Sequence, residues 1–176
     1  MGQFKVVVVA GRPRFFVSVY HERFTRWRVW ESHLPARKNA LIVDDDSTLR
    51  YVLARLARLA GYEILEANDG ANALETAQRK TPDVLVSDVR LPDFDGFELC
   101  RRLKADKSTK PIPVILVTSM YYESDAGSLA EGRKKAKSIG ALDLLPRGEA
   151  LEALGPMLRK LGGKKTAAKK TTAKKK

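Results

Sequence analysis

Residues 40–46 read ALIVDDD, an apolar run that ends abruptly in three aspartates. Four consecutive apolar residues are typical of a strand buried on both faces of a sheet. Apolar residues then recur at helical spacing until Gly61, and Ser47 or Thr48 can cap this helix. Asp46 is a further candidate for the cap, because its carboxylate can accept backbone N–H groups. We therefore expect a buried strand, an acidic loop and a helix.

The same unit repeats along the chain. Apolar runs predict further strands at 62–67, 83–87, 113–118 and 141–145. Apolar residues at helical spacing predict a helix after each strand, and Gly155-Pro156 should kink or restart the last one. Five strands alternating with five helices imply an α/β, doubly wound parallel sheet with helices on both faces.

Positive charge is concentrated at the two ends of the chain, whose formal net charge is +12. Residues 1–39 hold eight lysines and arginines against two glutamates, and residues 164–176 hold seven lysines and no acid. The middle is therefore nearly neutral, which argues against a nucleic-acid-binding globular domain. The lysine-rich tail can attract nucleic acid or acidic surfaces without specificity, and we expect any such affinity to reside there.

Several classes of site are excluded by composition. The single cysteine, Cys100, rules out an internal disulfide and multi-cysteine metal sites, and two histidines are too few for most histidine-based sites. The longest uncharged, mainly apolar run spans 111–122, whereas crossing a bilayer takes about 20 residues. We therefore expect no membrane span and a cytoplasmic location.

The length of 176 residues suits one domain with extensions. We expect a domain at 39–161 and a disordered lysine-rich tail at 162–176. Residues 1–38 form a basic and aromatic extension, in which 6–10 and 15–20 can pair as a hairpin. Its stretch 24–30 suits single-stranded nucleic acid or a membrane surface. We favour the alternative that the extension is no functional module, with a native start near Val29 or Leu34.

Polar side chains follow the predicted strands at their carboxyl ends, where parallel sheets bind ligands. Asp44, Asp45 and Asp46 end the first strand and Asp88 ends the third. If these strands are neighbours, the carboxylates converge, and their repulsion favours a bound cation such as Mg²⁺. Thr118 and Arg147 end the fourth and fifth strands, and their donors suit a bound phosphoryl group.

Five motifs together resemble the receiver domain of two-component response regulators, of the stand-alone kind seen in chemotaxis. They are LIVDDDS at 41–47, SD at 87–88, LPDFDG at 91–96, VTS at 117–119 and GA at 140–141. The resemblance covers residues 39–161. It implies a flavodoxin-like fold with the strand order 2-1-3-4-5 in a bacterial, cytoplasmic phosphorelay protein.

The resemblance also implies roles for individual residues. Asp88 matches the phosphoacceptor that takes a phosphoryl group from a histidine kinase. Asp44 and Asp45 match the pair that positions Mg²⁺, with Asp45 the direct ligand and Asp44 acting through water. Asp88 and the backbone carbonyl of Arg90 would complete the metal site. Thr118 matches the switch hydroxyl that bonds to the phosphoryl oxygen.

Three positions depart from the family pattern. Arg147 stands at the family's lysine position and is a candidate phosphoryl contact, and Gly148 replaces the proline that follows. Leu144 occupies a position where an aromatic switch residue is frequent. The stretch 118–140 is also several residues longer than usual. We therefore predict that the domain is phosphorylated but that its signal is transmitted more weakly or differently.

These patterns favour a phosphorylation-dependent signalling module and not an enzyme that acts on free substrates. Its partners would be a sensor histidine kinase or phosphotransfer protein and a downstream protein target. Two alternatives stay open. One is a receiver-like scaffold that binds partners without phosphorylation. The other is a Mg²⁺-dependent phosphatase or phosphotransferase that uses the same acidic cluster.

Overall fold

The computed structural model of the chain describes residues 5–11, 14–20, 38–119 and 126–163. The chain divides into two compact units, residues 1–37 and 38–176. In the first unit, β1 (Lys5–Gly11) pairs with β2 (Arg14–Tyr20) as an antiparallel hairpin, as the sequence predicts. The basic and aromatic stretch 24–30 and the lysine-rich residues 164–176 lie outside the described residues.

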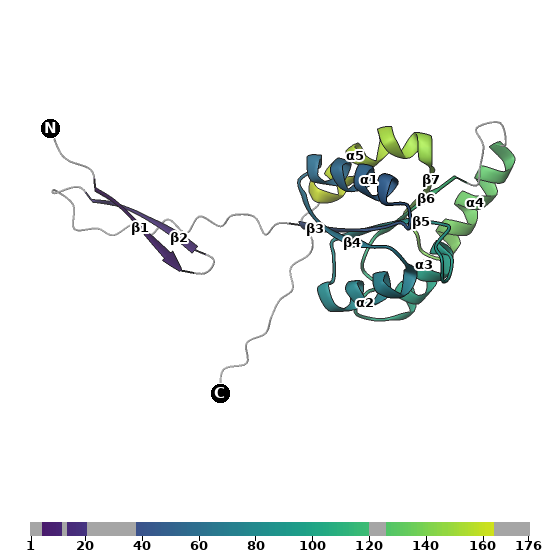
Figure 1. The fold of residues 1–176 in the computed structure, drawn as a ribbon, viewed down its shortest axis with the longest axis horizontal. Helices are drawn as coiled ribbons and strands as arrows, with labels where there is room; N and C mark the ends of the chain where they lie inside the picture. Colours follow the sequence, from purple (N-terminus) through teal and green to yellow (C-terminus); the bar gives the residue numbers. More distant parts are fainter. Residues whose placement is uncertain (1–4, 12–13, 21–37, 120–125, 164–176) are drawn as a thin grey trace. The chain divides into compact units, whose positions relative to one another are not determined.

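The second unit alternates strands and helices (Figure 1). Its elements are β3 (Lys38–Val43), α1 (Ser47–Leu59), β4 (Tyr62–Ala67), α2 (Gly70–Lys80), β5 (Val84–Asp88), α3 (Gly96–Ala105), β6 (Val114–Thr118), α4 (Ala126–Ser138), β7 (Asp143–Pro146) and α5 (Arg147–Gly163).

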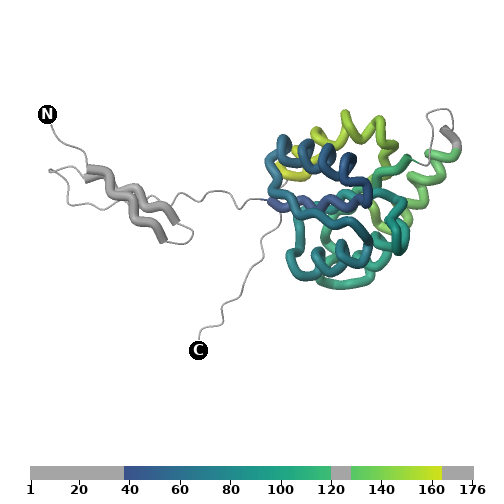
Figure 2. Tube along the Cα trace, in the orientation of Figure 1, coloured from purple at the N-terminus to yellow at the C-terminus, as the bar shows by residue number. Residues whose placement is uncertain are grey.

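The five strands form one parallel sheet in the order β4-β3-β5-β6-β7, which is the predicted order 2-1-3-4-5. Helices α1 and α5 cover one face, and α2, α3 and α4 cover the other (Figures 1 and 2). Alternate residues of one strand therefore enter different cores. In β3, Leu41 packs under α2 and α3, whereas Ile42 packs under α1 and α5. This two-sided burial explains why the strands are continuously apolar.

The helix starts show which capping prediction was right. Asp46, and neither Ser47 nor Thr48, caps α1, and its carboxylate accepts from the backbone N–H of Thr48 at 2.8 Å and of Leu49 at 3.3 Å. A carboxylate before the first turn also interacts favourably with the positive end of the helix dipole. This cap ends the acidic loop and sets the direction of α1.

The last helix is continuous where the sequence predicts a kink or a restart, so a restart is excluded. Helix α5 continues through Gly155-Pro156 without a restart and ends at Gly163. Ala150, Leu154 and Leu158 on either side of the proline are all buried against the sheet. This packing stabilises the helix on both sides of the proline and offsets the hydrogen bond that proline lacks. Gly162 and Gly163, predicted to lie in the disordered tail, therefore belong to the helix.

Candidate functional site

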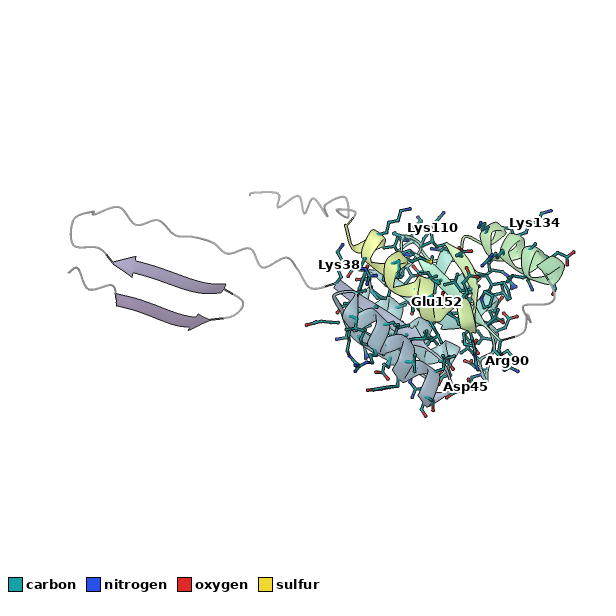
Figure 3. The ribbon with its side chains drawn as sticks, turned by 90° about the horizontal axis from the view of Figure 1, so that it is seen from above. Lys38, Asp45, Arg90, Lys110, Lys134 and Glu152 are labelled. Carbon is teal, nitrogen blue, oxygen red and sulfur yellow. The ribbon has the colours of Figure 1, made fainter. Side chains whose placement is uncertain are left out.

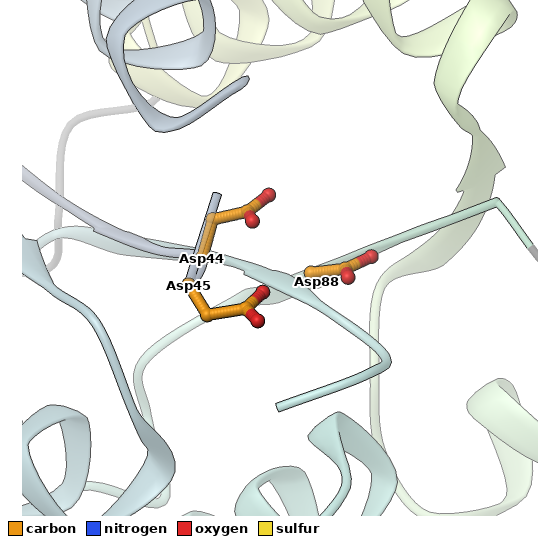
Figure 4. A group of neighbouring side chains, drawn as sticks. All are labelled: Asp44, Asp45 and Asp88. Atoms are coloured by element: carbon orange, nitrogen blue, oxygen red, sulfur yellow. The ribbon is translucent and has the colours of Figure 1, made fainter. Parts of the chain in front are cut away.

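The acidic residues converge because β3 and β5 are adjacent. Val43 is paired with Ser87 in the sheet, so the residues that follow them, Asp44 and Asp88, end the strands side by side. Carboxylate oxygens of Asp44, Asp45 and Asp88 all lie within 4.8 Å of one another (Figure 4). The structure thus brings together the three carboxylates that the sequence predicts as metal ligands.

These carboxylates differ in their exposure. Asp44 is 0% exposed and Asp88 is 1% exposed, whereas Asp45 is exposed to solvent. Burial raises the pKa of Asp44 from 3.8 to about 6; the backbone N–H of Asp46 opposes this shift and the charge of Asp88 adds to it. Burial also raises the pKa of Asp88, against the lowering effect of Arg147. Keeping these buried carboxylates ionised therefore costs electrostatic free energy.

Three hydrogen bonds fix the position of Asp44. Its N–H donates to the carbonyl of Ala67 at 3.2 Å, and its own carbonyl accepts from Arg50 Nη1 at 2.6 Å. Its Oδ1 accepts from the N–H of Asp46 at 2.9 Å. Arg50 also lies 3.4 Å from Glu66 on β4 and is largely buried. Sequence reasoning missed Arg50, because its partner is a backbone carbonyl.

Two carboxylate oxygens have no partner among the described residues. They are Asp44 Oδ2 and Asp88 Oδ1, and both are buried. Leaving buried carboxylate oxygens without a partner is costly. A hard divalent cation such as Mg²⁺ takes oxygen ligands of this kind. Together with the exposed Asp45, the cluster has the donor chemistry that such an ion requires.

Gly96 allows the chain to return to Asp88. Its N–H donates to the carbonyl of Val89 at 2.8 Å, and a Cβ placed on Gly96 would lie 2.4 Å from the carbonyl oxygen of Asp88. A side chain at this position is therefore incompatible with the backbone at Asp88. Asp95 then caps α3 by accepting from the N–H of Glu98 at 2.7 Å.

The loop between β5 and α3 is also attached to α2, which sequence reasoning did not predict. The carboxylate of Asp93 accepts from the N–H groups of Gly70 at 2.9 Å and Ala71 at 2.8 Å. Phe94 lies so close to Gly70 that a Cβ there would lie 2.4 Å from its ring. These contacts connect the start of α2 with the segment that follows Asp88.

Arg147 is the first residue of α5 and reaches the acidic cluster. Its Nη2 lies 3.3 Å from Asp88 Oδ2, so this guanidinium contacts the carboxylate directly. Its Nε is buried with no partner among the described residues. Arg147 therefore lies at the same edge of the sheet as the acidic cluster, beside Asp88. Its contact with a phosphoryl group stays a prediction.

The other residues that the sequence singled out lie in β6, in β7 and in the loop after β5. Thr118 is fully buried at the end of β6, next to β5 in the sheet. Arg90, two residues after Asp88, donates from its guanidinium to Ser119 Oγ at 2.8 Å, and metal binding by its carbonyl stays a prediction. Leu144 is fully buried in β7. Thr118 and Arg90 therefore come from the elements that adjoin Asp88.

The chain belongs to the response regulator receiver domain family, whose model matches residues 40–155. It is 40% identical over 121 residues to the response regulator MprA of Mycobacterium leprae, covering 69% of this chain and 49% of that protein. It is 43% identical to the response regulator PleD of Caulobacter vibrioides over 108 residues, or 61% of this chain and 22% of PleD. The chain thus spans about half of MprA and less of PleD.

A solved structure shows the same fold. The chemotaxis response regulator CheY4 of Vibrio cholerae matches with a TM-score of 0.61 and 29% identity, over 71% of this chain and 98% of CheY4. Within the part of the chain that the structure describes, no helix is long and apolar enough to cross a bilayer. The fold of the family and the acidic cluster therefore occur together in this chain.

Proposed function

We propose that Asp88 accepts a phosphoryl group from a sensor histidine kinase or phosphotransfer protein. The observation that carries this proposal is the geometry of the acceptor. One buried oxygen of Asp88 has no partner among the described residues, and the other contacts Arg147 at 3.3 Å. Asp44 and Asp45 would hold Mg²⁺ together with Asp88, and the bound ion would neutralise charge on the phosphoryl oxygens.

The proposed transfer forms one bond and breaks one bond. An ionised Asp88 oxygen attacks the phosphorus, while the P–N bond to the donor's imidazole breaks and its electron pair stays on the nitrogen. Arg147 neutralises charge that develops on the phosphoryl oxygens, and the Thr118 hydroxyl donates a hydrogen bond to the product. Positioning and charge neutralisation supply most of the catalysis in such transfers.

Phosphorylation would then change the binding of a downstream protein. The acceptor is part of the protein and is itself modified, so we propose a signalling module in the cytoplasm and not an enzyme for free phosphoesters. Leu144 lacks the aromatic ring and hydroxyl of a frequent switch residue, and Gly148 removes a backbone constraint in the first turn of α5. The signal therefore depends on Thr118 and Arg147.

One observation favours a second function, a receiver-like scaffold that is never phosphorylated. The permanently charged guanidinium of Arg147 lies beside the carboxylate of Asp88. This ion pair neutralises part of the negative charge that a bound metal ion would otherwise neutralise. In a scaffold, this pair would hold the site in one state. Phosphorylation itself distinguishes the two functions.

The test measures the mass of the intact protein after incubation with acetyl phosphate and Mg²⁺. The wild type should gain one phosphoryl group, Asp88→Asn should gain none, and Asp45→Ala should gain none because metal binding is lost. Asp46→Asn is the matched control. It changes an adjacent exposed acid that caps α1, and asparagine is also a good helix cap, so the fold and the labelling should persist.

Two results would decide against the proposal. Continued single labelling of Asp88→Asn would identify a different acceptor. A wild type that takes up no phosphoryl group, and whose amide spectrum does not respond to Mg²⁺, would favour the scaffold.

A further inference from the structure

The start of helix α2 is capped by two carboxylates from different parts of the chain. The first N–H groups of a helix have no partner within the helix. In α2, Asp69 accepts from the N–H of Asn72 at 2.7 Å, as a residue directly before a helix commonly does. The two preceding N–H groups, of Gly70 and Ala71, are bound by the two separate oxygens of Asp93. The cap of α2 is therefore completed from the loop after β5.

Helices α1 and α3 begin in a simpler way. Asp46 directly precedes α1 and accepts from two of its N–H groups, and Asp95 directly precedes α3 and accepts from one. Asp69 occupies the same position before α2. Local capping therefore accounts for Asp69, whereas the two hydrogen bonds of Asp93 attach a different loop to the helix.

This loop begins directly after Asp88 and returns to it. The N–H of Val89 donates to the carbonyl of Val117 in β6 at 2.8 Å, and the N–H of Gly96 donates to the carbonyl of Val89 at 2.8 Å. These two bonds close the base of the loop. Asp93 therefore lies in a closed loop whose base adjoins the buried carboxylate of Asp88.

The loop also carries Arg90, whose backbone carbonyl is the remaining candidate ligand of the metal ion. Arg90 follows the closed base directly, and its side chain donates to Ser119 Oγ at 2.8 Å. In Figure 3, Arg90 and Asp45 lie toward the same end of the domain, away from Lys38 at the start of β3. The conformation of the loop therefore determines where the Arg90 carbonyl lies.

Phe94, the residue after Asp93, attaches the same loop to two helices. Its ring leaves no space for a Cβ on Gly70 at the start of α2, and the guanidinium of Arg102 in α3 lies 4.1 Å from the ring centre. The ring also packs against the core under these helices. Polar and apolar contacts at adjacent positions therefore fix the loop to α2.

The hydrogen bonds of Asp93 persist at neutral pH. Desolvation raises the pKa of Asp93, but backbone N–H groups, among them those of Gly70 and Ala71, outweigh this effect and hold the pKa below 3.8. The carboxylate is therefore ionised, and its charge faces the positive end of the α2 dipole.

We propose that Asp93 is a positioning residue for the metal site, because it binds the start of α2 and so holds the loop that carries Arg90. The loop is then already in place when Mg²⁺ binds, which lowers the cost of ordering a ligand. This inference rests on the proposed function, since it requires Mg²⁺ at the acidic cluster. Coupling between two sites is reciprocal, so bound Mg²⁺ should stabilise the start of α2 in turn.

The test compares Asp93→Ala with Asp69→Ala in the full chain. Both variants remove a carboxylate that caps α2, so both should lower the midpoint of thermal unfolding, but only Asp93 lies in the loop. Calorimetric titration should show that Asp93→Ala weakens Mg²⁺ binding about tenfold, as loss of a residue that orients a metal ligand does. Asp69→Ala should leave the affinity unchanged. Asp93→Asn keeps one acceptor oxygen and should restore part of the affinity.

Amide hydrogen exchange provides a second measurement that is independent of phosphorylation. In wild type and in Asp69→Ala, Mg²⁺ should slow the exchange of the Gly70 and Ala71 amides. In Asp93→Ala these amides should exchange faster and should not respond to Mg²⁺, because their link to the loop is lost.

Equal Mg²⁺ affinities of Asp93→Ala and Asp69→Ala would show that Asp93 only caps α2 and would overturn the inference. A response of the Gly70 amide to Mg²⁺ that persists in Asp93→Ala would do the same. If Asp93→Ala does not fold, Asp93→Asn and Asp69→Asn give the same comparison. Labelling of wild type at Asp88 separates these results from failure of the proposed function, in which wild type gains no mass and binds no Mg²⁺.

Discussion

The two edges of one sheet have opposite chemistry. At the carboxyl edge, Asp44 and Asp88 are buried and share their environment with Arg147. At the amino edge, exposed lysines have no carboxylate partner among the described residues. Parallel strands point every helix start toward the first edge and every helix end toward the second, and helix dipoles favour acids and bases there, respectively. The comparison teaches that the topology of a fold can place acidic and basic residues at opposite edges of a sheet even where their numbers along the sequence are nearly equal.

The largest expected effect concerns the ionisation of Asp44. Its pKa is raised from 3.8 to about 6, so the folded state holds the proton more tightly than the unfolded state. Its contribution to stability is therefore present below about pH 4 and is lost as the pH rises through about 6. Asp44→Asn should become more stable relative to wild type over this window, by up to about 3 kcal/mol. Urea unfolding at several pH values without Mg²⁺ measures the difference.

Two controls accompany this measurement. Asp46→Asn should show the opposite sign, because the N–H groups of Thr48 and Leu49 lower the pKa of Asp46 in the folded state. Without this carboxylate, the free energy of unfolding should be lower than in wild type above about pH 4, and the difference should disappear as the pH falls below that value. Added Mg²⁺ should stabilise wild type but not Asp44→Asn. A difference between Asp44→Asn and wild type that does not change with pH would show that burial does not raise this pKa.

The next effect compares glycines at the two edges. Gly96→Ala places a Cβ against the Asp88 carbonyl, so the backbone must shift, and we expect a loss of about 2 kcal/mol and slower phosphorylation. Gly61 at the amino edge has a φ of +93° and open space around its Cβ position. Gly61→Ala should cost about 1 kcal/mol through strain alone and leave phosphorylation unchanged. Thermal unfolding and labelling rates check both, and equal labelling rates would contradict the role of Gly96.

A smaller effect distinguishes two arginines of α1 that contact the same glutamate. Arg50 contacts the Asp44 carbonyl and Glu66, whereas the one ion pair of Arg58 with a described residue is to Glu66, at 3.7 Å. Arg50→Met should weaken Mg²⁺ binding roughly tenfold, the equivalent of one charged hydrogen bond. Arg58→Met should not weaken it. Calorimetric titration with Mg²⁺ measures both affinities, and equal losses would show that Arg50 acts only through general stability.

The smallest effect concerns Arg147. Arg147→Lys keeps the positive charge but shortens the side chain and removes its planar pair of donors. We expect the rate of phosphorylation or the lifetime of the phosphoryl group to change by about tenfold or less, or ~1 kcal/mol. Both rates are measured by the decay and growth of the phosphorylated mass. Identical rates in both proteins would show that the guanidinium makes no contact with the phosphoryl group.

Local patterns in the sequence predicted most of the elements and the identity of the acidic residues. The apolar run in residues 40–46 predicts a buried strand, and the prediction is right because helices cover both faces of the sheet. Asp46 is a candidate cap because it precedes an apolar helical pattern. Pro156 does not interrupt the last helix, because Leu154 and Leu158 on either side of it are packed on the sheet. A local signal such as a proline can therefore be outweighed by packing against residues far away in the sequence.

The sequence by itself determined the alternation of strands and helices, the resemblance to receiver domains and the residues that end each strand. Only the tertiary structure placed Asp44 beside Asp88, buried both, and brought Arg147 to 3.3 Å from Asp88. It alone attached Asp93 to the start of α2 and gathered Lys107, Lys110 and Lys137 at one edge. The physical reason is that strand adjacency and burial depend on pairing and packing between segments far apart in the chain, which no local pattern encodes.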